Sequence, residues 1–272
     1  MGDATAIAGF LLINPRSGGG GLNADELEAE ARARGLETHV LLEGEVAAEL
    51  AREADADALG IAGGGGSLAP VAEVAIERDL RFVCVPFGTR NHFARDIGLD
   101  RDDPICALDA FGGMERRVDV GRAHGRVFLN NVSLGLCARL VHRREHHRRR
   151  RDALARIRAF GLLLRRPRPI GFIVDGDPIA ARVLLVANNY YSLELFAVGE
   201  REQVDEGLLH LYAAAGILPY TWEERTGTRF VVDTSRHRVS AAVDGEPEQL
   251  ETPLDFTIDP QALRVLLPPQ RS

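Results

Sequence analysis

The sequence predicts an α/β protein, with an N-terminal three-layer α/β domain followed by a C-terminal, mainly antiparallel β domain. Two observations predict this fold class. Over residues 1–118, apolar strand-like runs alternate with helix-like segments, which is the pattern of a parallel sheet with helices on both faces. Beyond Val118, short strand-like runs dominate, and turn dipeptides such as Asp175-Gly176 and Asp244-Gly245 separate them. We therefore assign residues 1–118 to the first domain and residues 119–272 to the second.

Local signals mark the elements of the first domain in order. Asn23 followed by Glu26 has the spacing of a capping box and begins a helix that ends near Gly35. Asp103-Pro104 supplies an N-cap and a proline at the first helical position, so a helix begins there as well. The expected strands are residues 7–13, 37–42, 58–62 and 81–85, and the further helices are residues 45–54, 67–78 and 104–111.

The second domain is expected to be a set of short strands with one arginine-rich helix, about residues 139–165, inserted among them. Whether the C-terminal tail returns to the first domain stays open. The expected strands are residues 126–134, 170–174, 181–187, 207–213, 230–233, 238–243, 254–258 and 263–267.

The most informative local feature is the glycine run that follows the strand at residues 58–62. Gly63 to Gly66 lead into Ser67, which opens a helix. A strand that ends in side-chain-free backbone and turns into a helix N-terminus favours phosphate, because the amides are accessible and the helix dipole attracts negative charge. A second polar turn, Pro86 to Asn91, follows the next strand, so a ligand is expected at the carboxyl edge of the sheet. The alternative is a flexible loop without a ligand.

Composition excludes several classes of function. The net charge of −7 gives the 272-residue chain no general attraction for nucleic acid. All basic residues are arginine, which excludes a P-loop lysine and a lysine nucleophile or base. Cys84, Cys106 and Cys137 have no paired spacing, so neither a disulfide framework nor a zinc site is expected. No apolar run approaches the roughly 20 residues that span a bilayer, and we expect a cytoplasmic protein.

Five segments, taken in order, resemble the motifs of the diacylglycerol kinase catalytic-domain family, especially its bacterial lipid kinases. They correspond to the family patterns NPxSG, GGDGT or GGDGS, GTxNDFAR, a VDLGR-like strand and DGE. In this chain they read Asn14-Pro15-Arg16-Ser17-Gly18, Gly63-Gly64-Gly65-Gly66-Ser67, Gly88-Thr89-Arg90-Asn91-His92-Phe93-Ala94-Arg95-Asp96, Val118-Asp119-Val120-Gly121-Arg122 and Asp244-Gly245-Glu246.

The resemblance implies a nucleotide-binding α/β domain, a β-sandwich domain and an active cleft between them. It implies transfer of the γ-phosphoryl group of ATP, with Mg²⁺, to a lipid hydroxyl such as that of diacylglycerol. Glu246 matches the family's proposed proton acceptor, and Asp244 belongs to the same catalytic turn. The segment from Val204 to Leu209 resembles a DGLL segment that holds a structural Mg²⁺, for which the ligands here would be Gln203, Glu206 and Leu208. The implied phosphate-binding residues are Asn14, Pro15, Arg16, Ser17, Gly18, Gly63, Gly64, Gly65, Gly66, Ser67, Thr89 and Asn91.

Gly65 departs from the family pattern, which has aspartate at this position. Glycine offers neither a metal ligand nor a base. Two further functions therefore stay open beside the lipid kinase. One is a catalytically impaired protein that binds nucleotide or lipid, and the other is a kinase for a soluble substrate.

The segment from Arg139 to Arg168 combines many arginines with an apolar stretch. A basic amphipathic segment of this kind suits an anionic membrane surface, where a lipid substrate would be collected. A solvated helix and a homodimer surface are the alternatives. Nucleic-acid binding is not expected from this segment, because aromatic residues do not interleave with the arginines.

Overall fold

The computed structural model describes residues 8–18, 22–88, 91–135, 170–191, 201, 203–214 and 222–269, which form two compact units. Unit 1 comprises residues 1–120, 202–205 and 260–272, and unit 2 comprises residues 121–201 and 206–259. Two strands, β5 (Met114–Ala123) and β16 (Leu254–Leu267), contribute residues to both units. The predicted Arg-rich helix, Cys137 and Thr89 lie outside the described residues.

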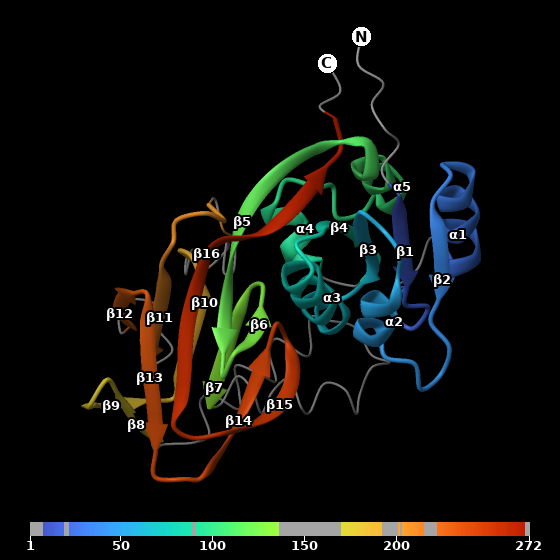
Figure 1. Cartoon of the computed structure of the whole chain (residues 1–272). Coiled ribbons are helices and arrows are strands. Elements are labelled where there is room, and N and C mark those ends of the chain that lie inside the picture. The colour runs from blue at the N-terminus through green and yellow to red at the C-terminus, as the bar shows by residue number, and fades with distance from the viewer. Residues whose placement is uncertain are drawn as a thin grey trace. The chain divides into compact units, whose positions relative to one another are not determined.

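Unit 1 is built on a parallel sheet in the order β2, β1, β3, β4 (Figure 1). The C-terminal part of β16 extends this sheet, since Val265 pairs with Phe82 of β4 in parallel register. The elements of unit 1 are β1 (Gly9–Ile13), α1 (Ala24–Ala33), β2 (Glu37–Val40), α2 (Ala47–Glu53), β3 (Ala58–Gly63), α3 (Gly65–Glu77), β4 (Arg81–Pro86), α4 (His92–Asp96), α5 (Pro104–Leu108) and the 3₁₀ helix η1 (Asp109–Gly112).

Helices cover both faces of the unit 1 sheet. Leu27 of α1 and Phe111 of η1 pack in one buried cluster with Leu11 and Ile13 of β1. The chain moves in one direction along the sheet from β1 to β2 and in the opposite direction from β2 to β3 and β4. With right-handed crossovers, α1 therefore lies on one face and α2 and α3 lie together on the other, as Figure 1 shows. The predicted α/β class is confirmed.

The capping box predicted for α1 is confirmed, because the Asn23 side chain accepts from the Glu26 N–H and the Glu26 carboxylate accepts from the Asn23 N–H. Two helices of unit 1, α3 and α4, differ from expectation. Helix α3 begins at Gly65 rather than at Ser67, since the Ser67 and Leu68 amides both donate to the Gly64 carbonyl. Helix α4 was not predicted, because five residues are too few to show a periodic pattern.

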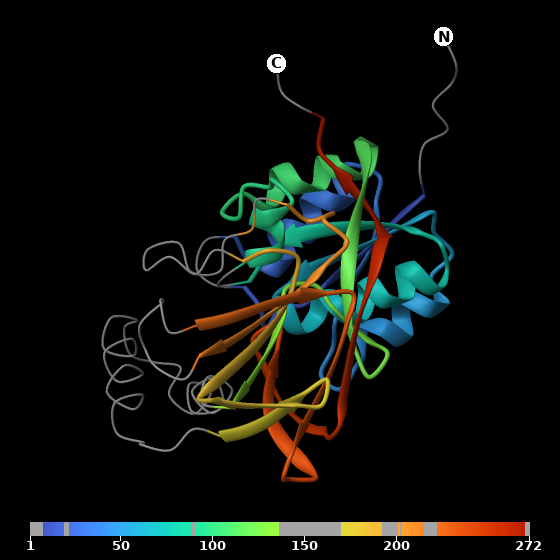
Figure 2. The ribbon, with the colours of Figure 1, turned by 90° about the vertical axis from the view of Figure 1, so that its left-hand side faces the viewer.

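Unit 2 consists of antiparallel strands in two sheets. One sheet has the order β12, β11, β10, β7, β14, β15, and in the other β16 is followed by β13, β8 and β9. The β8–β9 hairpin is the yellow pair in Figure 2. Besides β5 and β16, the strands are β6 (Arg126–Phe128), β7 (Asn131–Gly135), β8 (Ile170–Val174), β9 (Asp177–Ala181), β10 (Val183–Asn188), β11 (Leu209–Ala214), β12 (Trp222–Gly227), β13 (Arg229–Thr234), β14 (Arg238–Val243) and β15 (Glu246–Glu251).

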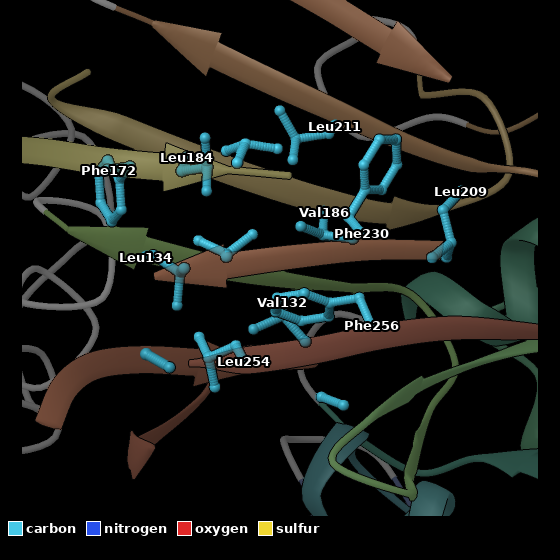
Figure 3. Close-up of a cluster of buried hydrophobic side chains, with 14 of the residues drawn as sticks. Val132, Leu134, Phe172, Leu184, Val186, Leu209, Leu211, Phe230, Leu254 and Phe256 are labelled. Atoms are coloured by element: carbon cyan, nitrogen blue, oxygen red, sulfur yellow. The ribbon is translucent and has the colours of Figure 1, made fainter. Parts of the chain in front are cut away.

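A single apolar cluster holds the two sheets of unit 2 face to face, as Figure 3 shows. In strands such as β7, β10 and β11, every second residue contributes to it, as expected for strands with one buried face. This is the β-sandwich that the resemblance implied. Its labelled members are Val132, Leu134, Phe172, Leu184, Val186, Leu209, Leu211, Phe230, Leu254 and Phe256.

Three strand predictions in the second domain were wrong. Residues 126–134 are not one strand but β6 and β7, because the amides of Leu129 and Asn130 leave the ladder and donate to the Asp244 side chain. Residues 254–258 and 263–267 are one continuous strand, β16. Strands β9, β12 and β15 were missed as strands in their own right. Strands β12 and β15 are mostly polar and contain no buried residue, and β9 begins with exposed Asp177 and Pro178.

No helix in the described ranges is long and apolar enough to cross a membrane.

Candidate functional site

Three loops of unit 1 meet at the carboxyl edge of its parallel sheet, where β1, β3 and β4 end. The Asn14 side chain, after β1, donates from Nδ2 to Ser67 Oγ at 2.8 Å. Ser17 Oγ accepts from the Gly64 N–H at 3.3 Å. The loop after β1 is therefore tied to the glycine run after β3. Of the other residues in this turn, Pro15, Arg16 and Gly18 are exposed.

The loop after β4 contacts the glycine run through backbone alone. A Cβ atom built on Gly88 would lie 2.8 Å from Gly64 Cα, so only glycine permits this approach. Asn91 fixes the loop, since its Oδ1 accepts from the Gly88 N–H at 2.9 Å and its Nδ2 donates to the Arg101 carbonyl at 2.8 Å. Asn91 has a φ of 42°, a left-handed conformation that asparagine tolerates better than most residues. These contacts make one cluster, which we call the three-loop cluster: Asn14, Ser17, Gly63, Gly64, Gly65, Gly66, Ser67, Gly88 and Asn91.

The N-terminus of α3 belongs to this cluster. Gly65 and Gly66 are its first residues, Gly64 is its N-cap, and no side chain caps it. The first turn of α3 contains no acidic residue. The positive end of the helix dipole and the first amides therefore face the loops without a competing carboxylate, which suits an anionic oxygen-rich ligand.

Asp244 occupies the first position of the β14–β15 turn in unit 2 and is bound by backbone groups. Its Oδ2 accepts from the Leu129 N–H at 2.8 Å, and its Oδ1 accepts from the N–H groups of Asn130 and Asn131 at 2.7 and 3.1 Å. Burial raises the pKa of the Asp244 carboxyl, and the three N–H donors oppose that rise. The carboxylate thus holds the β6–β7 turn in place, and its oxygens are committed to that role.

Arg201 supports the same turn and was missed by sequence reasoning. It is 6% exposed, donates from Nη1 to the carbonyls of Leu129 and Asn188, and donates from Nη2 to Asn130 Oδ1. Its guanidinium carbon lies 5.6 Å from the centre of the Tyr191 ring, a cation–π contact. No local signal marks this role, because these partners lie at least 10 residues away in sequence.

Glu246, two residues after Asp244, is exposed at the start of the edge strand β15. The two carboxylates of the turn therefore differ in environment. Asp244 is engaged by the backbone, whereas Glu246 is accessible to solvent and to a ligand. An accessible carboxylate is the better proton acceptor of the two.

The residues that the resemblance implies as Mg²⁺ ligands include two that already have partners within the protein. Glu206 Oε2 accepts from the Tyr190 N–H and lies 3.0 Å from His210 Nε2. The Leu208 carbonyl accepts from the Asn189 N–H at 2.9 Å. Gln203 is exposed. Within the described residues, no group of three or more His, Cys, Asp and Glu side chains is arranged to hold a metal.

Comparison with known proteins finds a family match in the N-terminal part of the chain. The family model described as diacylglycerol kinase catalytic domain matches residues 8–123. The matched residues include every residue of the three-loop cluster, whereas Asp244, Glu246 and Glu206 lie beyond them.

Relatives of the same kind match part of this domain. The chain is 33% identical over 84 residues to a diacylglycerol kinase of Bacillus subtilis (strain 168), a match that covers 30% of this chain and 28% of the relative. It is 40% identical over 78 residues to a probable lipid kinase YegS-like of Pseudomonas fluorescens, which covers 28% of this chain and 26% of the relative. The matches thus span about a quarter of the length of these curated relatives.

Solved structures resemble the fold of the whole chain. A crystal structure of a diacylglycerol kinase from Bacillus anthracis str. Sterne superposes with a TM-score of 0.69 at 16% identity and covers 97% of this chain and 98% of that one. A putative diacylglycerol kinase from the same organism gives a TM-score of 0.72 at 18% identity, with the same coverage. At this identity the likeness shows the fold alone.

Proposed function

We propose that this protein binds ATP at the three-loop cluster and transfers its γ-phosphoryl group to the hydroxyl of a lipid such as diacylglycerol. The observation that carries the proposal is the close contact of Gly88 with Gly64 beside the uncapped N-terminus of α3. Backbone amides at such a position bind phosphate oxygens, because no Cβ atom blocks the approach. The match of residues 8–123 to a kinase family model supports ATP as the ligand.

In this reaction the hydroxyl oxygen forms a bond to the γ-phosphorus while the bond between that phosphorus and the bridging oxygen of ADP breaks. The hydroxyl proton must leave, and we assign its acceptance to Glu246, which is exposed. Asn14, Ser17, Ser67 and Asn91 would orient the phosphates with neutral side chains. The catalytic role expected for Asp244 becomes a positioning role in this proposal, because its oxygens accept three backbone hydrogen bonds.

Gly65 favours a second candidate, a protein that binds nucleotide without transferring phosphate. The first turn of α3 has no carboxylate, so the described part of the three-loop cluster does not fit a Mg²⁺ ion held by the glycine run. Binding by backbone amides needs no carboxylate, whereas transfer needs the developing charge to be stabilised. The two candidates therefore predict the same nucleotide binding and different turnover.

We expect ATP to stabilise the wild-type protein against heat and to lose that effect in Gly88→Ala. With nucleotide well above its dissociation constant, the melting temperature is expected to rise by about 5 °C. The alanine methyl group would push Gly88 away from Gly64 and separate two loops of the cluster. Differential scanning fluorimetry with ATP, ADP and inorganic phosphate measures the effect.

Gly112→Ala is the matched control for this experiment. Gly112 lies in the same unit, and no heavy atom lies within 4 Å of the added Cβ position. It should keep the ATP-dependent shift in full. If ATP shifts neither the wild type nor Gly112→Ala, nucleotide binding is refuted; if it shifts them and Gly88→Ala equally, the ligand binds elsewhere. Labelled ATP and a lipid panel then decide between transfer and binding alone.

A further inference from the structure

His210 lies between two carboxylates on the face of its sheet that points away from the apolar core of unit 2. Its Nδ1 is 2.9 Å from Glu224 Oε1, and its Nε2 is 3.0 Å from Glu206 Oε2. The His210 side chain is only 5% exposed, so water does not separate these groups from one another. Both ring nitrogens of His210 are therefore engaged by carboxylate oxygens.

Two aromatic rings complete the surroundings of His210. The Tyr212 ring stacks on the imidazole with centroids 6.1 Å apart and an interplanar angle of 20°. The Tyr190 ring meets it edge-on at 5.6 Å and 80°. Burial raises the pKa of the Tyr212 phenol, which keeps this neighbour neutral. The imidazole is thus enclosed by two carboxylates and two aromatic rings.

Glu206 joins the His210 side chain to the backbone segment that follows β10. Its Oε2 also accepts from the Tyr190 N–H at 3.0 Å, and its own N–H donates to Asn189 Oδ1 at 3.1 Å. The segment around Glu206 is thereby fixed to the segment that follows β10. A divalent cation bound by a carboxylate and carbonyls would perform the same task, because it links oxygens from separate segments.

We propose that the segment around Glu206 folds without a divalent cation, because the Glu206 carboxylate is already bound by the His210 imidazole and by the Tyr190 N–H. Side-chain and backbone groups of the chain thus link these segments in place of a metal ion. This inference concerns the architecture of unit 2 and holds whether or not the protein transfers phosphate.

The wild-type protein gives the first test. After dialysis against buffer with EDTA, elemental analysis should find Mg²⁺ and Ca²⁺ well below one equivalent, and the melting temperature should equal that of undialysed protein. Added Mg²⁺, Ca²⁺ or Mn²⁺, without nucleotide, should not raise it. One equivalent of retained metal, or a loss of about 5 °C or more in EDTA, would overturn the proposal.

A gain of metal binding gives the second test. His210→Asp would place a third carboxylate beside Glu206 and Glu224 and remove the imidazole ring. This variant should melt at least about 5 °C below the wild type in EDTA and should recover much of that loss when Ca²⁺ or Mg²⁺ is added. His210→Asn, the neutral control of the same size, should be destabilised without recovery. If the His210→Asp protein folds and neither ion raises its melting temperature, the proposal that the ring takes the place of a cation is contradicted.

Discussion

Replacing Gly65 by aspartate is expected to raise the rate of phosphoryl transfer from ATP to a lipid by about 100-fold or more, because one well-placed charged or polar group is worth that much at a transferring group. Gly65 is the first residue of α3, and its backbone is helical, a conformation that aspartate adopts without strain. A carboxylate in the first turn also interacts favourably with the helix dipole, by about 0.3–1 kcal/mol. The variant should therefore fold.

The physical reason for the gain is the missing charge in the three-loop cluster. Asp96, a carboxylate that follows Asn91 of the three-loop cluster in sequence, is buried. Arg95 donates to it from Nε at 2.9 Å and from Nη2 at 2.6 Å. In the wild type, the glycine run thus offers backbone amides but no side chain that could hold a metal ion or orient a hydroxyl. An aspartate at position 65 would supply such a side chain.

Two matched variants make the measurement decisive. Gly65→Asn has the same size without the charge, and Gly66→Asp has the same charge one residue further along α3. Initial rates of transfer from labelled ATP, divided by the rate of the wild type, should rise in Gly65→Asp alone. Equal rates in all four proteins, with ATP still bound, would show that the charge at position 65 is irrelevant and would leave Gly65 without a catalytic consequence.

The sequence predicts secondary structure well where it depends on neighbouring residues, and less well where it depends on contacts between residues far apart in the chain. Strands β1, β3 and β4 of unit 1 are apolar and buried on both faces, so their apolar runs located them well. The capping signal at Asn23 located the start of α1. Strands β12 and β15 lie at the edges of a sheet and are mostly exposed. Their sequences therefore lack the alternation that predicts a strand.

The candidate site divides in the same way. The glycine run and the asparagine turn are local motifs, and the sequence identified both, but it placed the start of α3 two residues too late. The roles of Arg201 and His210 depend on partners brought together by the fold, such as Asn130 and Glu224. Sequence spacing carries no information about such contacts, because the pairing of β7, β10, β11 and β12 creates them.

Asp244→Ala is expected to lower the free energy of unfolding by about 2–4 kcal/mol, because it removes the acceptor of three backbone N–H groups in a partly buried turn. The charge of buried Arg201, which acts on the Asp244 carboxyl, would lose its nearby counter-charge as well. Asp244 also has a φ of 48°, a conformation less accessible to alanine than to aspartate. Chemical denaturation followed by circular dichroism measures the loss.

Glu246→Ala is the control for this prediction, since it removes the other carboxylate of the same turn. Glu246 is exposed, so its removal should change the free energy of unfolding by less than about 0.5 kcal/mol. If the protein transfers phosphate, the same variant should lose turnover by a factor of about 10²–10⁴, the usual contribution of a proton acceptor. An Asp244→Ala protein as stable as the wild type, but without turnover, would instead place Asp244 in the chemistry and remove it from the support of the β6–β7 turn.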